Sequence, residues 1–152
     1  MKNKLQLFLA CTLLLTVSVA HGIGFFENWS SGSFTTNNWT FENNQQGNWA
    51  IANEFPPYNE VAQFIWSEEL NYSYTLLSPE FDGSASTSVT LSYSLYYEHY
   101  ALTGCEFLNV DVYDGSQWQN VINYDNSVQS YGWATETFDI SAYTVGHPFQ
   151  IR

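Results

Sequence analysis

The sequence predicts an all-β protein built as a β-sandwich of two packed antiparallel sheets. Three observations predict it. Several segments alternate strictly between apolar and polar residues, polar turns rich in Asn, Gly and Ser separate them, and Trp, Tyr and Phe make up 18% of the chain. Alternation gives a strand one core-facing side, and aromatic residues favour strands. No segment shows a sustained helical period, and 152 residues suit a single domain.

The N-terminus, residues 1–20, predicts a secretory signal peptide. Lys2 and Lys4 give a positive start, an apolar stretch follows, and small residues lead to a cleavage point near Ala20 or Gly22. The stretch is short for a membrane anchor, and no basic flank follows it. We therefore expect no membrane insertion after the signal peptide is removed.

Residues 23–152 then form the exported domain, located outside the cell or at its surface. A lipoprotein acylated at Cys11 is a less favoured alternative, because the apolar run continues through 13–15 after that cysteine. Cys105 remains as a single cysteine, so the fold must be held by packing instead of disulfides.

Signal removal makes the domain strongly acidic. Loss of Lys2 and Lys4 leaves Arg152 against 15 Asp and Glu residues, so the formal charge moves from −12 to −14. Nucleic acids and anionic membranes are then disfavoured partners, because both are bound through Lys and Arg. Calcium and neutral glycans fit better, although an acidic surface that only confers solubility explains most of the charge.

The clearest predicted strand covers 89–97, where alternate residues from Val89 to Tyr97 share one side. A second covers 106–113 and ends at Asp114-Gly115, a pair that predicts a type I′ hairpin turn. Further strands are expected at 25–27, 117–124, 134–143 and 148–152.

Two other segments are expected to be irregular. Residues 59–70 have a weak helical spacing but no clear cap, which predicts a loop with at most one helical turn. In "YTLLSPEFDG", residues 74–83, Pro79 ends a strand because it lacks an N–H. Glu80 and Asp82 are expected to face solvent on either side of an inward Phe81.

Two carboxylates are candidate metal ligands because the alternation of their strands turns their side chains towards the core. Glu27 is in phase with Phe25, and Glu106 is in phase with the apolar side of its strand. An inward carboxylate is costly unless it is paired, and the domain almost lacks cations. A structural calcium ion is therefore one prediction for Glu27 and Glu106. The equally weighted alternative places both at the sheet rim, in water.

Four aromatic residues are candidate ligand contacts, because exposed rings stack on sugars and other ligands. They are Tyr96, Tyr100, Tyr113 and Trp118. For any one ring, shielding of a strand edge is the more frequent role.

The sequence contains none of the common catalytic motifs, such as G-x-S-x-G, a P-loop, H-E-x-x-H or C-x-x-C. A glycosidase needs only two suitably spaced carboxylates. Among 15 Asp and Glu residues some pair will have that spacing by chance, so the requirement is weak evidence for an enzyme. No catalytic residue is predicted.

The order of motifs resembles a known family. "FFENWSSGSFTTNNWTF", "LLSPEFDGSASTSVTLSYSLYY", "EFLNVDVYDGSQWQNV" and "GWATETFDISAYTVGHPFQIR" follow one another as in the MAM-like, cleaved-adhesin-type modules of secreted bacterial surface proteins. The resemblance covers nearly the whole exported domain. It implies a jelly-roll sandwich that acts in adhesion or ligand binding and often holds calcium, and it carries over Glu27 and Glu106.

The chain departs from this pattern at its end, because such modules continue to a closing strand after the segment that resembles "FQIR". The expectation is a jelly roll that lacks its closing strand, as in a fragment of a longer protein. The favoured function is a non-catalytic, secreted adhesion module that binds glycan or protein. A small carboxylate-dependent hydrolase and a purely structural spacer are the alternatives.

Overall fold

The computed structural model describes residues 6–7, 13–18, 24–43, 47–65, 72–98, 106–127 and 131–152. Within these ranges the regular secondary structure is almost entirely antiparallel strand, so the predicted all-β sandwich is confirmed. The helical parts are one turn each, η1 (Thr35–Asn37) and α1 (Ser141–Thr144). No helix in the described ranges is long and apolar enough to cross a membrane.

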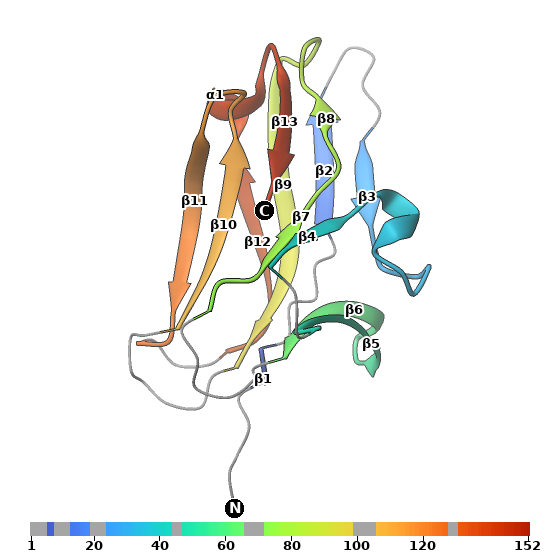
Figure 1. Ribbon diagram of the computed structural model, residues 1–152. Helices are drawn as coiled ribbons and strands as arrows, with labels where there is room; N and C mark the ends of the chain where they lie inside the picture. The colour runs from blue at the N-terminus through green and yellow to red at the C-terminus, as the bar shows by residue number, and fades with distance from the viewer. Residues whose placement is uncertain are drawn as a thin grey trace, which may run out of the picture.

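Two four-stranded sheets form the sandwich (Figure 1). The first has the order β11 (Trp118–Asp125), β10 (Phe107–Tyr113), β13 (Pro148–Ile151) and β8 (Phe81–Asp82). The second has the order β12 (Tyr131–Asp139), β9 (Ser88–Tyr97), β2 (Leu13–Ser18) and β3 (Phe25–Glu27).

Two smaller sheets complete the described fold. One has the order β1 (Gln6–Leu7), β6 (Tyr58–Ile65) and β5 (Trp49–Phe55), and the other pairs β4 (Thr40–Glu42) with β7 (Thr75–Leu77). Strands β1 and β2 both fall inside the predicted signal peptide. The signal peptide stays a prediction.

The core lies between the two large sheets and is built on the alternation of β9. Val89, Leu91 and Leu95 are fully buried, and Tyr93 and Tyr97 nearly so. Burying one such aliphatic side chain contributes about 1.5–3 kcal/mol. Tyr93 also reaches the first sheet, because its hydroxyl lies 2.6 Å from the hydroxyl of Tyr124 on β11. The sequence alternation therefore identified the core side of this strand correctly.

The predicted loop at 59–70 is wrong over its described part, because β6 covers Tyr58–Ile65. Residues 66–70 lie outside the described ranges. β5 and β6 form a hairpin around Pro56-Pro57, with Ile51 opposite Ala62. Pairing with β5 gives the described part of this segment cross-strand partners along one edge, and this outweighs a weak helical spacing without a cap.

The turn between β10 and β11 also differs from the prediction. Asp114 donates its N–H to the carbonyl of Gln117, so Gly115 and Ser116 are the central residues. Gly115 has a φ of 88°, and Asp114 and Ser116 have negative values. A positive φ at the first central position alone is the pattern of type II′ turns, whereas type I′ needs it at both.

The strand expected at 134–143 ends earlier, at Asp139. The Asp139 carboxylate accepts the N–H of Ser141 at 2.9 Å, which stabilises the start of α1. The hydroxyl of Ser141 then accepts the N–H of Val89 at 2.9 Å, which ties α1 to β9. A local side-chain acceptor thus ends the strand where alternation alone would continue it.

The corner at "YTLLSPEFDG" has the predicted arrangement. Glu80 and Asp82 are exposed, and Phe81 packs on Phe25 and Phe149 at 4.9 and 5.4 Å between ring centroids. Gly83 is required by a close approach, because a Cβ there would lie 2.1 Å from the carbonyl oxygen of Thr144. The carboxylates therefore mark a corner of the sandwich.

Candidate ligand-binding face

The outward side of β10 and β11 carries the strongest candidate site. Leu108, Val110 and Val112 point into the core, so the intervening residues face out. We define the β10–β11 face as the outward residues of these two strands together with the neighbouring Arg152, namely Phe107, Asn109, Asp111, Tyr113, Trp118, Asn120, Asn123, Asp125 and Arg152.

Aromatic rings form one end of this face. Tyr113 and Trp118 are opposite each other in the strand register, with ring centroids 5.3 Å apart. The guanidinium carbon of Arg152 lies 4.3 Å from the centre of the Trp118 ring, a cation–π contact. Both rings are half-buried. Each ring is therefore held in place while part of it reaches solvent.

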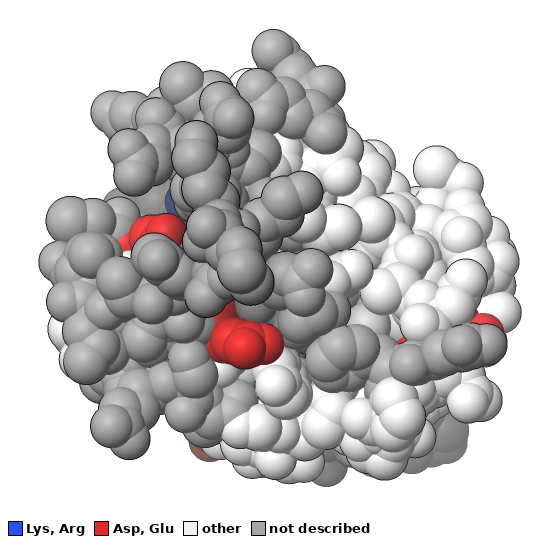
Figure 2. All heavy atoms as spheres, turned by 90° about the horizontal axis from the view of Figure 1, so that it is seen from below, with Lys and Arg blue, Asp and Glu red and all other residues white. Residues whose placement is uncertain are grey.

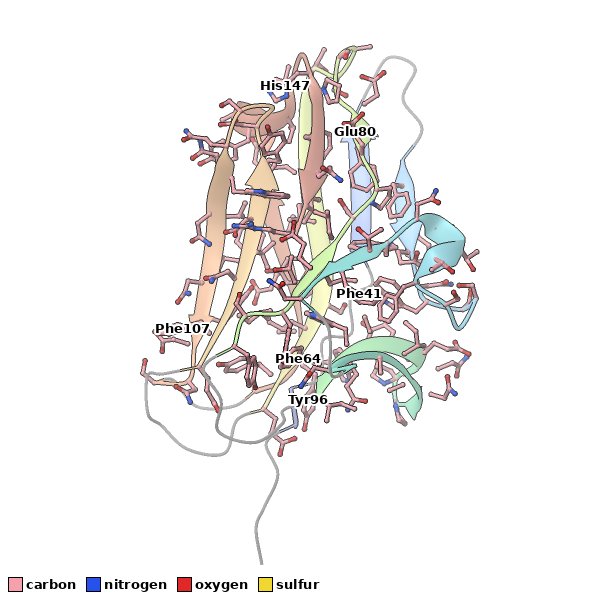
Figure 3. All side chains as sticks on the ribbon, viewed as in Figure 1. Phe41, Phe64, Glu80, Tyr96, Phe107 and His147 are labelled. Carbon is pink, nitrogen blue, oxygen red and sulfur yellow. The ribbon has the colours of Figure 1, made fainter. Side chains whose placement is uncertain are left out.

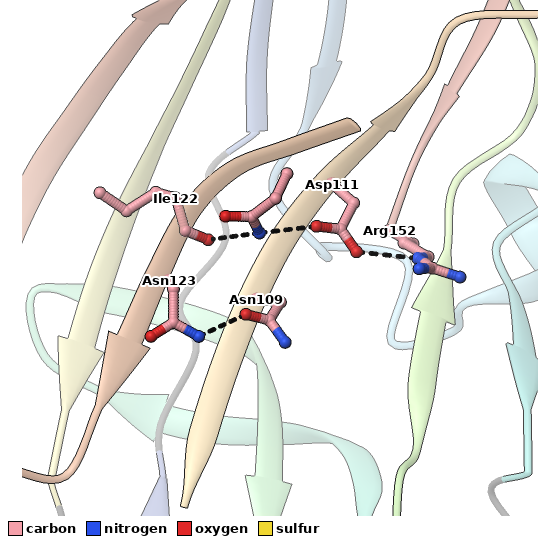
Figure 4. Close-up of polar contacts among 6 residues, drawn as sticks. Asn109, Asp111, Ile122, Asn123 and Arg152 are labelled. Atoms are coloured by element: carbon pink, nitrogen blue, oxygen red, sulfur yellow. Dashed lines mark hydrogen bonds and ion pairs between the residues drawn. The ribbon is translucent and has the colours of Figure 1, made fainter. Parts of the chain in front are cut away.

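Polar groups form the middle of the face (Figure 4). One carboxylate oxygen of Asp111 accepts the Nε–H of Arg152 at 3.0 Å, and the other accepts the amide N–H of Asn120 at 2.7 Å. The backbones of Asp111 and Arg152 also bond each other in both directions. This network fixes the positions of the side chains and leaves Asn120 exposed.

The amide pair Asn109 and Asn123 continues the row, with Asn123 donating to Asn109 at 2.5 Å. Both side chains are exposed. At the far end Phe107 is 59% exposed, and Figure 3 shows it at the lower end of β10. A strand from Phe107 to Tyr113 spans about 20 Å. The face thus presents aromatic rings at both ends and amides between them.

The structure separates the four aromatic residues predicted as ligand contacts. It brings Tyr113 and Trp118 together on the β10–β11 face. Tyr96 lies on β9 of the other sheet, 5.5 Å from the Trp133 ring. Tyr100 lies outside the described residues.

Tyr96 belongs to a second aromatic cluster, which we call the hairpin contact and define as Tyr58, Tyr96 and Trp133. Here the β5–β6 hairpin packs on β9 and β12. Tyr58 donates its hydroxyl to Ser94 at 2.7 Å, and Trp133 donates its indole N–H to the carbonyl of Pro56 at 2.8 Å. These bonds hold the hairpin on the sheet, which is a structural role.

Glu27 points inward as predicted and is 2% exposed. One carboxylate oxygen accepts the N–H of Trp29 at 2.8 Å, and the other accepts the amide N–H of Asn37 at 2.7 Å. Trp29 has a φ of 60°, so the carboxylate supports a left-handed backbone turn. These hydrogen bonds compensate the burial of Glu27 without a metal.

Glu106 is half-buried and lies just before β10. Its carboxylate accepts the amide N–H of buried Asn126 at 2.7 Å. Figure 1 places β3, which carries Glu27, and the start of β10 on opposite sides of the molecule. The two carboxylates therefore do not share one site. No group of three metal-ligating side chains occurs in the described ranges, and calcium stays a prediction.

Several other carboxylates have structural partners. Asp82, Asp125 and Asp139 each accept hydrogen bonds from the Ser two residues later, which lower the pKa of each carboxyl. Asp114 accepts from Gln119, Gln117 and Ser116, and these bonds hold its pKa far below the usual range. A catalytic acid needs the opposite shift. Figure 2 shows Asp and Glu as separate patches on the lower end of the molecule.

Sequence reasoning missed most of the polar part of the face. The alternation of residues 106–113 predicts that Asn109 and Asp111 point outward, but nothing in the sequence marks either of them as a site. Asn120 and Arg152 join them only through strand pairing and sheet order. The usable signal was the alternation in "EFLNVDVY", which places an aromatic residue at each end of its outward row.

Comparison with known proteins gives no independent identification. No protein family, curated protein or solved structure matches the chain. The resemblance to MAM-like modules therefore stays an expectation from the sequence, and function must be argued from the face itself.

Proposed function

We propose that this protein is a non-catalytic extracellular binding module that takes a neutral glycan on the β10–β11 face. The observation that carries the proposal is a row of exposed amides, with aromatic rings at both of its ends. The row is formed by Asn109, Asn123 and Asn120. Sugar rings have apolar C–H faces that stack on aromatic rings and hydroxyls that pair with amides and carboxylates.

The side chains of the face are held in place before a ligand binds, and this supports the proposal. Asp111 is held by Arg152 and Asn120, and Trp118 is held by Arg152. A ligand then meets side chains that have already lost much of their conformational freedom, which lowers the entropic cost of binding. The acidic balance of the chain favours neutral over anionic glycans, because the cation next to the rings is already paired with Asp111.

A glycan array probed with the exported protein tests the proposal, followed by calorimetry with the best ligand. Trp118→Ala should weaken binding at least about tenfold, since a ring that stacks on the sugar contributes more than about 1.4 kcal/mol. Phe107→Ala should also weaken binding if the glycan spans the face.

Phe26→Ala is the matched control, because Phe26 is 52% exposed on β3 of the other sheet, against 59% for Phe107. It should leave affinity unchanged. An array without any neutral glycan ligand, or equal losses from Phe26→Ala and Phe107→Ala, would contradict the proposal. The first result would favour a structural spacer, and protein ligands would then be the next to test.

A further inference from the structure

The β10–β11 face is long compared with a single sugar. Phe107 begins β10 and Tyr113 ends it, so the two residues lie about 20 Å apart along the strand. Trp118 is opposite Tyr113, and the exposed amides lie between the two ends. A pyranose ring is no larger than an indole ring, so one sugar can contact only one end. A ligand that uses both ends must therefore be a chain of several sugars.

The amides in the middle of the face have hydrogen-bonding atoms that the protein leaves free (Figure 4). Asn123 donates from its Nδ2 to the Oδ1 of Asn109, and within the described residues the Nδ2 of Asn109 and the Oδ1 of Asn123 make no hydrogen bond. Asn120 donates to Asp111 and to the carbonyl of Ile122, which leaves its Oδ1 as an acceptor. Free donors and acceptors side by side match neighbouring sugar hydroxyls, each of which both donates and accepts.

The two aromatic ends differ in how firmly their rings are held. Trp118 contacts both the ring of Tyr113 and the guanidinium of Arg152. Phe107 is 59% exposed and contacts no other ring within the described part of the chain. A ring that is already ordered loses less freedom on binding, so a sugar should bind more tightly at Trp118. Phe107 should contribute once a chain is already held at the other end.

The end of the face at Phe107 also carries a carboxylate. Asp125 is opposite Phe107 in the strand register, and one of its oxygens accepts the N–H and the hydroxyl of Ser127. Both of these donors are neutral, and the ion pair between Arg152 and Asp111 lies nearer the other end. An acidic sugar beside Phe107 would meet a like charge, whereas a sugar hydroxyl can donate to the carboxylate. This end therefore also favours a neutral sugar.

We infer that the ligand is a straight, ribbon-like chain of neutral pyranoses joined by equatorial linkages, which lies along β10 and stacks one sugar at each end of the face. The inference rests on the proposed function and specifies its ligand. Equatorial linkages keep successive rings in line, with C–H groups on the faces and hydroxyls at the edges. Two sugars can then stack on the aromatic rings while those between them contact the amides. Axial linkages coil the chain, which lifts one end away from the strand.

Calorimetry on the whole protein with oligosaccharides of defined length tests the inference. The probes are cello-, manno- and xylo-oligosaccharides, which are equatorially linked, from disaccharide to hexasaccharide. At least one series should bind, and its hexasaccharide should bind at least about tenfold more tightly than its disaccharide, because the second stacked sugar is already held near its ring. Maltohexaose is the axially linked match for cellohexaose and should show no such gain over maltose.

Variants at the two ends of the face show which ring each probe contacts. Phe107→Ala should weaken hexasaccharide binding at least about threefold and leave disaccharide binding unchanged. Trp118→Ala should weaken the binding of both. Phe26→Ala removes a similarly exposed ring from the other sheet and is the matched control, which should change neither.

Four results would overturn the inference and leave the proposed function intact. Disaccharide and hexasaccharide could bind equally well, which would mean that a single sugar fills the site. Phe107→Ala could leave hexasaccharide binding unchanged. Maltohexaose could bind as tightly as the equatorially linked hexasaccharides. Finally, all three equatorially linked series could fail to bind while the array yields another neutral glycan that depends on Trp118. An array without any neutral glycan ligand would instead overturn both.

Discussion

The β10–β11 face and the hairpin contact use similar side chains for different purposes. Each has a Trp beside a Tyr, at 5.3 Å for Trp118 and Tyr113 and at 4.8 Å for Trp133 and Tyr58. At the hairpin contact another segment covers the sheet and pairs with the polar ends of the rings. On the β10–β11 face, the partners are neighbours within the same sheet, and Asn109, Asn120 and Asn123 remain exposed.

The difference shows that aromatic content does not by itself identify a binding face. A ring whose polar atom bonds a covering segment stabilises the fold. A ring that is held from the side keeps part of its surface free for a ligand. Trp133 and Trp118 illustrate the two cases, since the indole N–H of Trp133 bonds the carbonyl of Pro56, whereas Trp118 is held by Arg152 beside exposed amides. Tyr96, the other candidate by sequence, packs on Trp133.

The largest expected effect is on the free energy of unfolding, and it should distinguish Trp133 from Trp118. Trp133→Ala should lower the free energy of unfolding by about 3 kcal/mol, because it removes a ring held between Tyr58 and Tyr96 and a hydrogen bond to the hairpin. Trp118→Ala should lower the free energy of unfolding by only about 1 kcal/mol, because its ring is held from one side. Urea denaturation of both variants measures the difference, and equal losses would break the comparison.

Removal of Asp111 should have the next largest effect. Asp111→Ala removes the carboxylate that accepts from Arg152 and Asn120, so that Asn120 keeps only its bond to the carbonyl of Ile122, at a cost of about 2 kcal/mol. It should also weaken glycan binding, because Arg152 no longer holds Trp118. Asn109→Ala, on the same strand and exposed, should change stability by less than about 0.5 kcal/mol. A stable Asp111→Ala variant with unchanged binding would show that the face is not held in this way.

Tyr58→Phe tests the hydrogen bond beneath the hairpin while keeping the ring. Loss of the bond to Ser94 should lower the free energy of unfolding by about 1 kcal/mol. Glycan affinity should stay unchanged, since Tyr58 lies at the hairpin contact. Thermal and urea denaturation measure the loss. Reduced affinity in Tyr58→Phe would mean that the two regions are coupled.

Acidification should remove more of the stability contributed by Asp114, in the turn between β10 and β11, than of that contributed by Asp139 at the end of β12. Hydrogen bonds lower the pKa of Asp114 from 3.8, so its stabilising contribution is complete above pH 3.8 and is lost as pH falls towards the lower folded value. Asp114→Asn should therefore reduce the fall in Tm below pH 3.8. Asp139→Asn should reduce it less, because Asp139 has fewer donors. Equal effects would contradict this ranking.

Calcium should have the smallest effect on stability, because the carboxylates of Glu27 and Glu106 already accept hydrogen bonds from the protein. Added calcium should raise Tm by a few degrees, and chelator should reverse the rise, as for any ligand of the folded state. Glu27→Gln and Glu106→Gln then show which sheet binds the ion, since only the variant of the ligand loses the shift. Identical melting curves with calcium and chelator would remove the calcium prediction.

The sequence by itself determined the all-β class and the core side of β9 and β10. Period-two alternation is a local property, so Val89 to Tyr97 and Leu108 to Val112 could be assigned without knowing their neighbours. It also placed Phe81 inside and Glu80 outside at the corner, because Pro79 ends a strand wherever it occurs in such a run.

Only the tertiary structure decided which outward residues meet. Asp111 lies on β10, Asn120 on β11 and Arg152 directly after β13, and their contact depends on the sheet order β11-β10-β13, which no local pattern encodes. The same holds for β6, where pairing with β5 outweighed a weak helical spacing. Side-chain direction follows from the local backbone period, whereas contact between distant strands follows from how the whole sandwich closes.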